Sequence, residues 1–257
     1  MAYMMDNFDL SDIYEPDIDV STITIEHKST DESKPLCIFG VLKNSNGFDI
    51  EKEMLEWLLP EYNVYCVYQN APGYLFEYPA IRFMQYILEK ENKNFALYLH
   101  TKGAANSNFS QKCVRNAWKN EFTGDAKNKY IELVKDNECN VACPYKGNNR
   151  ATWFNGFYVT QNAILKLGKI MPHNNDRYYF ENMFNNALEV NIIGLVLPTS
   201  TASEVMSHVV RRPLTPYRYN PNTIKYLLPS RQIQTRTASN IQTKNFPSRI
   251  VKKRILF

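Results

Sequence analysis

Short apolar runs alternate with amphipathic helical periods along the first hundred residues of the chain. The runs at residues 35–42, 63–69 and 95–99 are predicted to be buried strands, and residues 49–62 and 77–94 repeat apolar positions at helical spacing. The order strand, helix, strand, helix, strand with short joints is typical of parallel strands linked by right-handed crossovers. This part of the chain therefore predicts an open α/β sheet.

The second half repeats the pattern less regularly. The predicted helices lie at residues 112–124, 127–137, 161–171 and 176–189, and the predicted strands at 140–146, 152–160 and 191–198. Asn155 and Gly156 interrupt one of these strands, where a turn or a close backbone approach is expected. The predicted fold class is α/β, with a Rossmann-like, mostly parallel central sheet flanked by helices in a single domain.

Charge is distributed unevenly and sets the expected domain limits. Residues 1–34 carry nine acidic residues, whereas residues 205–257 carry eleven lysines and arginines and no acidic residue. We therefore expect an acidic N-terminal extension (1–34), a folded domain (35–204) and a basic C-terminal extension (205–257). The extensions are either solvated or docked on each other, or the basic arm contacts nucleic acid or the surface of an anionic membrane.

The cysteines and the hydropathy indicate a cytoplasmic protein, which the basic arm could bring to a membrane as a peripheral protein. The five cysteines lie at scattered spacings, and neither a signal peptide nor an apolar run of about 18 residues is recognised. Cys139 and Cys143 have a spacing that a zinc site could use, but no second ligand pair accompanies them. No metal site is expected.

The segment His100, Thr101, Lys102 and Gly103 directly follows the strand at 95–99. Ligands of open α/β sheets bind outside the carboxyl ends of the strands. A lysine ammonium and a histidine donor beside the accessible backbone of Gly103 could hold a diphosphate, although an ordinary exposed loop is the alternative. The glycines of a P-loop and of the G-x-G-x-x-G fingerprint are missing from the sequence, so neither of these nucleotide sites is expected.

Four short blocks, ALYLHTKG, NAWKNEF, WFNGFYVT and DRYYFEN, occur in that order. Together they resemble glycosyltransferases of the GT-A fold, in particular the bacterial and viral group that carries an H-T-K-G motif and includes rhamnan-synthesis-like proteins. The resemblance covers roughly residues 35–198. It implies an inverting hexosyl- or deoxyhexosyltransferase that moves a sugar from a nucleotide sugar to a hydroxyl of a glycan or a lipid-linked acceptor, in the synthesis of surface polysaccharide or glycoprotein glycans.

The resemblance also implies how the donor diphosphate is bound. Most GT-A enzymes hold a divalent metal ion with a D-x-D motif at the end of the central strand, and H-T-K occupies that place here. Lys102, with His100 and Gly103, would neutralise the leaving diphosphate, because a fixed cation can do so without a metal. No cofactor is then required, and Mn²⁺ or Mg²⁺ is not expected.

Further roles follow from the same resemblance. Glu181 would be the catalytic base, with Asp176 as the second choice, and Arg177 would contact phosphate. The residues implied to bind the nucleotide and the sugar are Tyr74, Glu77, Trp118, Trp153, Asn155 and Gly156.

Several of these residues also have structural explanations. Glu77 could be a charge favoured at a helix N-terminus, and Asp176 a helix cap. Trp118 and Trp153 could fill the core. Glu181 could form an ion pair with Arg177 one helical turn away.

A second hypothesis is a non-catalytic α/β protein whose basic arm binds nucleic acid or an anionic surface. Tyr217, Tyr219 and Tyr226 lie among the cations of the arm, where they could stack on bases. The arm instead looks like an extended segment that wraps its own domain, because it contains Pro213, Pro216, Pro221 and Pro229. The sequence leaves open the sugar, the base, the acceptor and the oligomeric state.

Overall fold

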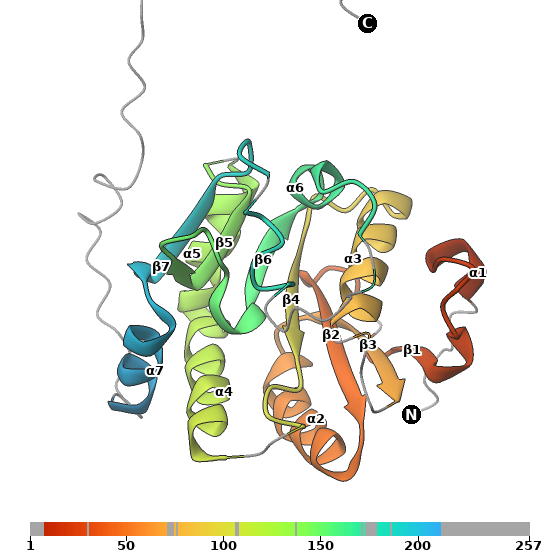
Figure 1. The fold of residues 1–257 in the computed structure, drawn as a ribbon, viewed down its shortest axis with the longest axis horizontal. Helices are drawn as coiled ribbons and strands as arrows, with labels where there is room; N and C mark the ends of the chain where they lie inside the picture. The colour runs from red at the N-terminus through yellow and green to blue at the C-terminus, as the bar shows by residue number, and fades with distance from the viewer. Residues whose placement is uncertain are drawn as a thin grey trace, which may run out of the picture. The chain divides into compact units, whose positions relative to one another are not determined.

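The computed structural model describes residues 8–29, 31–70, 75, 77–105, 108–136, 138–170, 172, 179–185 and 187–211. They include a seven-stranded sheet with the order β1-β3-β2-β4-β6-β5-β7 (Figure 1). The strands are β1 (Ile23–His27), β2 (Leu36–Lys43), β3 (Asn63–Asn70), β4 (Phe95–His100), β5 (Val141–Gly147), β6 (Phe157–Thr160) and β7 (Ile192–Ser200). Only β1 and β6 run against the common direction of the other strands. The predicted α/β class is confirmed.

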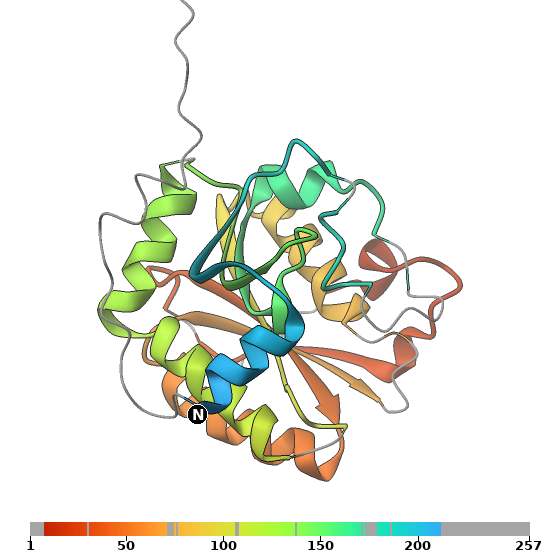
Figure 2. The same cartoon turned by 60° about the vertical axis from the view of Figure 1, so that its left-hand side comes forward.

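Helices cover both faces of the sheet (Figures 1 and 2). The helices are α1 (Leu10–Ile13), η1 (Val20–Thr22), α2 (Ser45–Leu58), α3 (Tyr78–Lys90), α4 (Phe109–Glu121), α5 (Gly124–Lys135), η2 (Trp153–Asn155), α6 (Gln161–Lys166) and α7 (Ala202–Arg211). One apolar cluster joins the sheet to α2, α4, α5 and α7, and a second joins it to α1, α3 and α6. In β4, Leu97 and Leu99 belong to the first cluster and Ala96 and Tyr98 to the second, because alternate side chains of a strand point to opposite faces.

Side-chain caps set the starts of several helices. Asn44 Oδ1 accepts a hydrogen bond from Gly47 N at 2.6 Å, so α2 begins earlier than the predicted residue 49. Asn108 caps α4 in the same way, and Thr160 caps α6. α2 therefore begins directly after β2, whereas α4 begins after the loop that follows β4.

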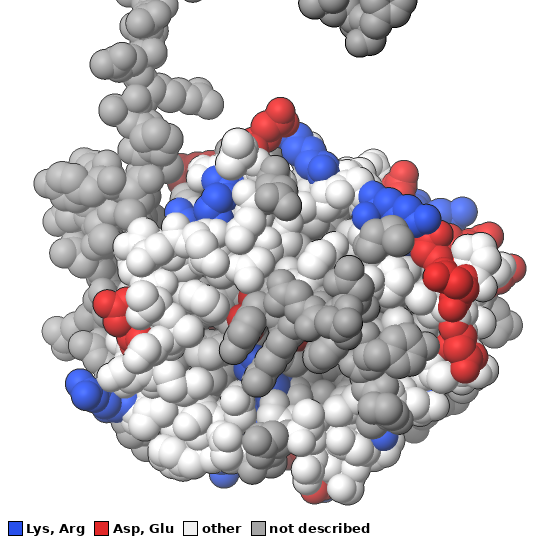
Figure 3. All heavy atoms as spheres, in the orientation of Figure 1, with Lys and Arg blue, Asp and Glu red and all other residues white. Residues whose placement is uncertain are grey.

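The acidic N-terminal segment takes part in the sheet. β1 pairs antiparallel with β3, although residues 23–27 fall inside the segment that we expected to be an extension. The acidic residues of α1, η1 and their flanks, most of them exposed, gather on the side of the molecule that α1 forms (Figure 3). At the other limit, α7 runs across the expected boundary at residue 204, and residues 212–257 of the basic arm lie outside the described residues.

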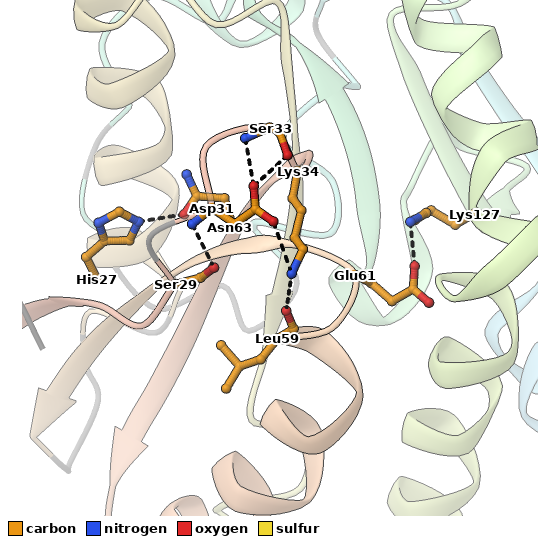
Figure 4. Close-up of polar contacts among 9 residues, drawn as sticks. All are labelled: His27, Ser29, Asp31, Ser33, Lys34, Leu59, Glu61, Asn63 and Lys127. Carbon is orange, nitrogen blue, oxygen red and sulfur yellow. Dashed lines mark hydrogen bonds and ion pairs between the residues drawn. The ribbon is translucent and has the colours of Figure 1, made fainter. Parts of the chain in front are cut away.

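The connection from β1 to β2 is held at the amino edge of the sheet (Figure 4). Asp31 Oδ1 accepts hydrogen bonds from the backbone and the hydroxyl of Ser33, at 3.1 and 2.5 Å. Lys34 Nζ donates to Leu59 O at 3.2 Å. This edge lies opposite the carboxyl ends of β2 and β4.

Residues 152–156 do not form the first half of a strand, as was predicted. They form η2 and a tight bend in which Phe154 and Asn155 have positive φ values of 68° and 53°. A Cβ atom on Gly156 would lie only 2.4 Å from Nε1 of Trp118, so the chain passes too close to the indole for any other residue. The bend therefore separates η2 from β6.

The helix predicted at residues 176–189 is also wrong where the structure describes it. Residues 179–185 are turns, in which Asn182 N donates to Tyr179 O at 3.1 Å and Asn185 N to Asn182 O at 2.9 Å. Asparagine side chains compete for backbone hydrogen bonds and favour turns over helix interiors. Glu181 therefore lies on a turn, and the prediction that it shares a helical face with Arg177 does not apply.

Candidate functional site

The H-T-K-G segment lies at the point where the connectivity of the sheet reverses. β2 and β4 are parallel neighbours, and the chain leaves β2 toward β3 on one side and β4 toward β5 on the other. Ligands of open α/β sheets bind at such a point. Thr101 joins the two strand ends, because its backbone N donates to Gly40 O at 2.9 Å and its hydroxyl accepts from Leu42 N at 3.1 Å.

Arg115 of α4 holds the loop that follows β4. Arg115 Nη1 donates to Lys102 O at 2.8 Å, and its Nε and Nη2 donate to the carboxylate of Glu53 at 3.1 and 3.0 Å. Gly103 has a φ of 95°, and a Cβ atom there would lie 2.8 Å from Cβ of Gln111. Arg115 was not among the predicted site residues, because nothing in the sequence distinguishes it from Lys112 and Lys119 of the same helix.

Lys102 and Glu181 meet although they are far apart in the sequence. Lys102 Nζ lies 3.7 Å from Glu181 Oε1, and the two side chains are only 19% and 10% exposed. Lys102 Nζ also lies 5.3 Å from the ring centroid of Phe154, a cation–π contact that was not predicted from the sequence. The alternative of an ordinary exposed loop does not describe this lysine.

The backbone around Glu181 is joined to η2. Thr152 N donates to Glu181 O at 2.9 Å. A buried ion pair adds little net stability, because the cost of removing both charges from water offsets their attraction. The Lys102–Glu181 pair is therefore not explained by the needs of the fold alone.

Asn155 links η2 to the start of α3. Its Nδ2 donates to Glu77 Oε1 at 3.3 Å, and its Oδ1 accepts from the hydroxyl of Thr152 at 3.5 Å. Asn155 is buried, and the carboxylate of Glu77 makes no capping hydrogen bond to α3. Burial and the nearby Glu77 raise the pKa of Tyr98 well above its usual value, so Tyr98 stays protonated. These contacts bring two predicted site residues, Glu77 and Asn155, into one polar cluster.

The indole of Trp118 lies against both His100 and Gly156. Trp118 has no exposed surface, so in this conformation it supports the site rather than contacting a ligand, which matches the structural alternative. The ring of His100 lies edge-on to that of Trp118, with centroids 5.6 Å apart. Within the part of the chain that the structure describes, His100 Nδ1, Tyr98 Oη and Trp118 Nε1 are buried without a hydrogen-bond partner.

Burial lowers the pKa of His100 well below its usual value of 6.5, and the charge of Lys102 adds to this effect. His100 is therefore neutral at pH 7, so within the H-T-K-G segment the positive charge comes from Lys102. The imidazole can still donate or accept one hydrogen bond at each nitrogen.

We expect His100 to make the protein less stable in mild acid. The folded state resists protonation of this ring, whereas the unfolded chain binds the proton as pH falls below about 6.5. The free energy of unfolding should then decrease by up to about 1.4 kcal/mol per pH unit until the lowered folded-state pKa is reached. Urea titrations between pH 7.5 and 5 test this, and a His100→Gln variant should lose that part of the slope. Equal slopes in both proteins would contradict it.

The remaining predicted residues either contact another part of the protein or lie outside the described residues. Trp153 is half-buried, and its Nε1 donates to Ser200 O at 3.1 Å, which ties η2 to the end of β7. Its indole N–H is thus used within the protein. Tyr74, Asp176 and Arg177 lie outside the described residues, so their predicted roles stay predictions.

Within the described ranges, no three histidine, cysteine, aspartate or glutamate side chains are grouped so that they could hold a metal ion. All five cysteines are buried and free, including Cys139 and Cys143. None of the described helices has both the length and the apolar character that crossing a bilayer requires.

Comparison of the chain with models of protein families, with curated proteins and with solved structures found no match in any of the three.

Proposed function

We propose that the protein is a glycosyltransferase that uses a nucleotide sugar as donor and a hydroxyl of a glycan or lipid-linked molecule as acceptor. The observation that carries the proposal is the Lys102–Glu181 pair at the carboxyl end of β4, beside the point where the connectivity of the sheet reverses. A fixed cation and a largely buried carboxylate next to each other supply the two charged groups that displacement at an anomeric carbon needs. The resemblance of the H-T-K-G segment to GT-A enzymes supports the same assignment.

In the proposed reaction, Glu181 accepts the proton of the acceptor hydroxyl. The acceptor oxygen forms a bond to the anomeric carbon while the bond from that carbon to the diphosphate oxygen breaks. The nucleoside diphosphate leaves with the electron pair, and Lys102 neutralises the developing charge. Attack opposite the leaving group inverts the anomeric centre.

The ion pair suggests how donor binding prepares the base. Without a donor, the charge of Glu181 is balanced in part by Lys102 at 3.7 Å. A bound diphosphate offers Lys102 a stronger counter-ion, since phosphate oxygens form charge-assisted hydrogen bonds with ammonium groups. Glu181 would then turn toward the acceptor hydroxyl. Asn155 and Glu77 are held together by their hydrogen bond close to this site and would bind hydroxyls of the donor.

Ligand-dependent stabilisation of the full-length chain tests the proposal. A panel of nucleotide sugars that covers the common bases and sugars should contain at least one donor that raises the melting temperature, because a ligand bound only to the folded state stabilises it. That donor should then be hydrolysed slowly or transferred. If no donor has an effect and the protein instead binds nucleic acid with a steep salt dependence, the non-catalytic hypothesis is favoured.

We expect transfer to continue when divalent metals are removed. Lys102 is covalently part of the chain and would supply the cation at the diphosphate. Activity measured in excess EDTA should fall no more than a few fold. Complete loss of activity in EDTA that is restored by Mn²⁺, but not by added salt, would show that a metal is required.

A further inference from the structure

A concave surface lies between the end of β7 and one face of α7. It encloses about 600 Å³. The residues that line this surface, called the α7 groove below, are Leu197, Thr199, Ser200, Ser203, Glu204, Ser207, His208 and Arg211. Hydroxyl and cationic side chains therefore provide most of its wall.

The side of α7 that faces the groove is not needed to pack the helix. Val205 and Val209 are buried and attach α7 to the core. Ser203, Ser207 and Arg211 follow one another at intervals of four residues, so they share a different face of the helix. Among the described residues, no carboxylate forms an ion pair with Arg211, and it is exposed. The groove thus contains an exposed cation.

Glu204, whose carboxylate lines the groove, accepts hydrogen bonds at the start of α7. Thr201 N and Thr201 Oγ1 donate to Glu204 Oε2 at 2.7 and 2.9 Å. These hydrogen bonds, led by that from the backbone, lower the pKa of Glu204. The charge of Glu204 is therefore stabilised by the helix N-terminus, about two turns from Arg211.

His208 also lines the groove, at a position of α7 between Glu204 and Arg211. Its ring is edge-on to the buried ring of Tyr145, with centroids 6.2 Å apart. Ser200, which also lines the groove, donates from its hydroxyl to Lys146 O at 3.2 Å and accepts from Trp153 at its backbone oxygen. The groove is thus joined through η2 to the Lys102–Glu181 pair but is formed by other residues.

We propose that the α7 groove binds the phosphate group of a ligand. An arginine fork can form two parallel hydrogen bonds with phosphate oxygens. The hydroxyls of Ser203 and Ser207 supply further donors along the same wall. The phosphate could belong to a soluble phosphate monoester or to a lipid headgroup, which share this chemistry. The proposal does not depend on the transferase activity.

Titration calorimetry of the full-length protein with inorganic phosphate, at low ionic strength, tests the site. Arg211→Gln should weaken phosphate binding by about tenfold or more, because it removes a charged hydrogen-bond donor. The matched control is Lys135→Gln, which removes one positive charge from the exposed last turn of α5 and should leave the affinity unchanged. Circular dichroism should confirm that both variants are folded.

Three results would overturn the proposal. They are no phosphate binding by the unaltered protein, equal weakening in the Arg211→Gln and Lys135→Gln variants, and loss of phosphate binding in Lys102→Ala but not in Arg211→Gln. The last result would assign all phosphate binding to the donor site. Because Lys102→Ala reports on the donor site and Arg211→Gln on the groove, either site can fail without the other.

Vesicles distinguish the two sources of phosphate. Cosedimentation with phosphatidylcholine vesicles that contain phosphatidic acid, lost in Arg211→Gln but not in Lys135→Gln, would support a lipid headgroup as the ligand. Binding of inorganic phosphate that depends on Arg211, together with vesicle binding that does not, would support a soluble phosphate monoester.

Discussion

Replacement of Glu181 by Gln is expected to lower turnover by about 10²- to 10⁴-fold and to leave the affinity for the donor nearly unchanged. The amide keeps the size and most of the hydrogen bonding of the carboxylate, but it cannot accept the proton of the acceptor hydroxyl. Steady-state kinetics at saturating donor, with donor affinity measured separately by calorimetry, would show whether the loss lies in the chemical step. A denaturant titration shows whether the variant is still folded.

The matched control for Glu181 is Glu189→Gln. Glu189 pairs with Lys166 at 3.3 Å and its side chain is 82% exposed, so the same substitution there should change neither turnover nor stability measurably. Near-normal turnover of Glu181→Gln would remove the proposed base. If Asp176→Asn then abolished turnover, the base would be Asp176 instead.

Replacement of Lys102 by Ala is expected to weaken donor binding by about 10- to 150-fold, which corresponds to the 1.5–3 kcal/mol of a hydrogen bond to a charged group. The same factor should appear for the free nucleoside diphosphate, because the lost contact is to the diphosphate. The structure adds a second expectation. Since Lys102 is largely buried and paired with Glu181, the variant should also be less stable, which an exposed lysine at a strand end would not cause.

Lys127 provides a control that matches Lys102 in its surroundings. Its Nζ lies 2.5 Å from Glu61 Oε2 (Figure 4). It also lies 5.5 Å from the ring centroid of Tyr62, and the side chain is 14% exposed. Lys127→Ala should therefore lose a comparable amount of stability and keep full affinity for the donor. Equal weakening of donor binding in the two variants would show that the effect comes from general destabilisation. Unchanged affinity in Lys102→Ala would refute the proposed diphosphate site.

The strands that carry the site could be predicted because each is a short apolar run, buried on both faces. The direction and neighbours of β6 could not be predicted. β6 lies between β4 and β5 and is antiparallel to both, and this arrangement depends on contacts between distant residues rather than on local periodicity. β1 was missed because its short alternation of apolar and polar residues lies in a segment dominated by acidic residues.

The site residues likewise divide into those with a local signal in the sequence and those whose contacts depend on distant parts of the chain. The position of Lys102 followed from the end of a predicted strand, which is a local signal. Its contacts with Phe154 and Glu181 depend on a bend with positive φ values and on a turn in place of a helix, and neither was visible in the apolar pattern. The bidentate contact between Arg115 and Glu53 spans 62 positions, so only the assembled fold reveals it.

The antiparallel pairing of β4 with β6 has a consequence for the kinetics of folding. Among the described strands it is the only pairing that joins β1, β3, β2 and β4 to β6, β5 and β7. It aligns Phe95 with Thr160. Closing so long a segment of chain costs conformational entropy before any contact compensates for it. Lys102 and Glu77 belong to the half of the sheet that contains β4. Asn155 and Glu181 belong to the half that contains β6. The proposed donor site therefore forms only when the two halves of the sheet join, so a nascent chain could not bind the donor that we propose until most of the chain has been synthesised.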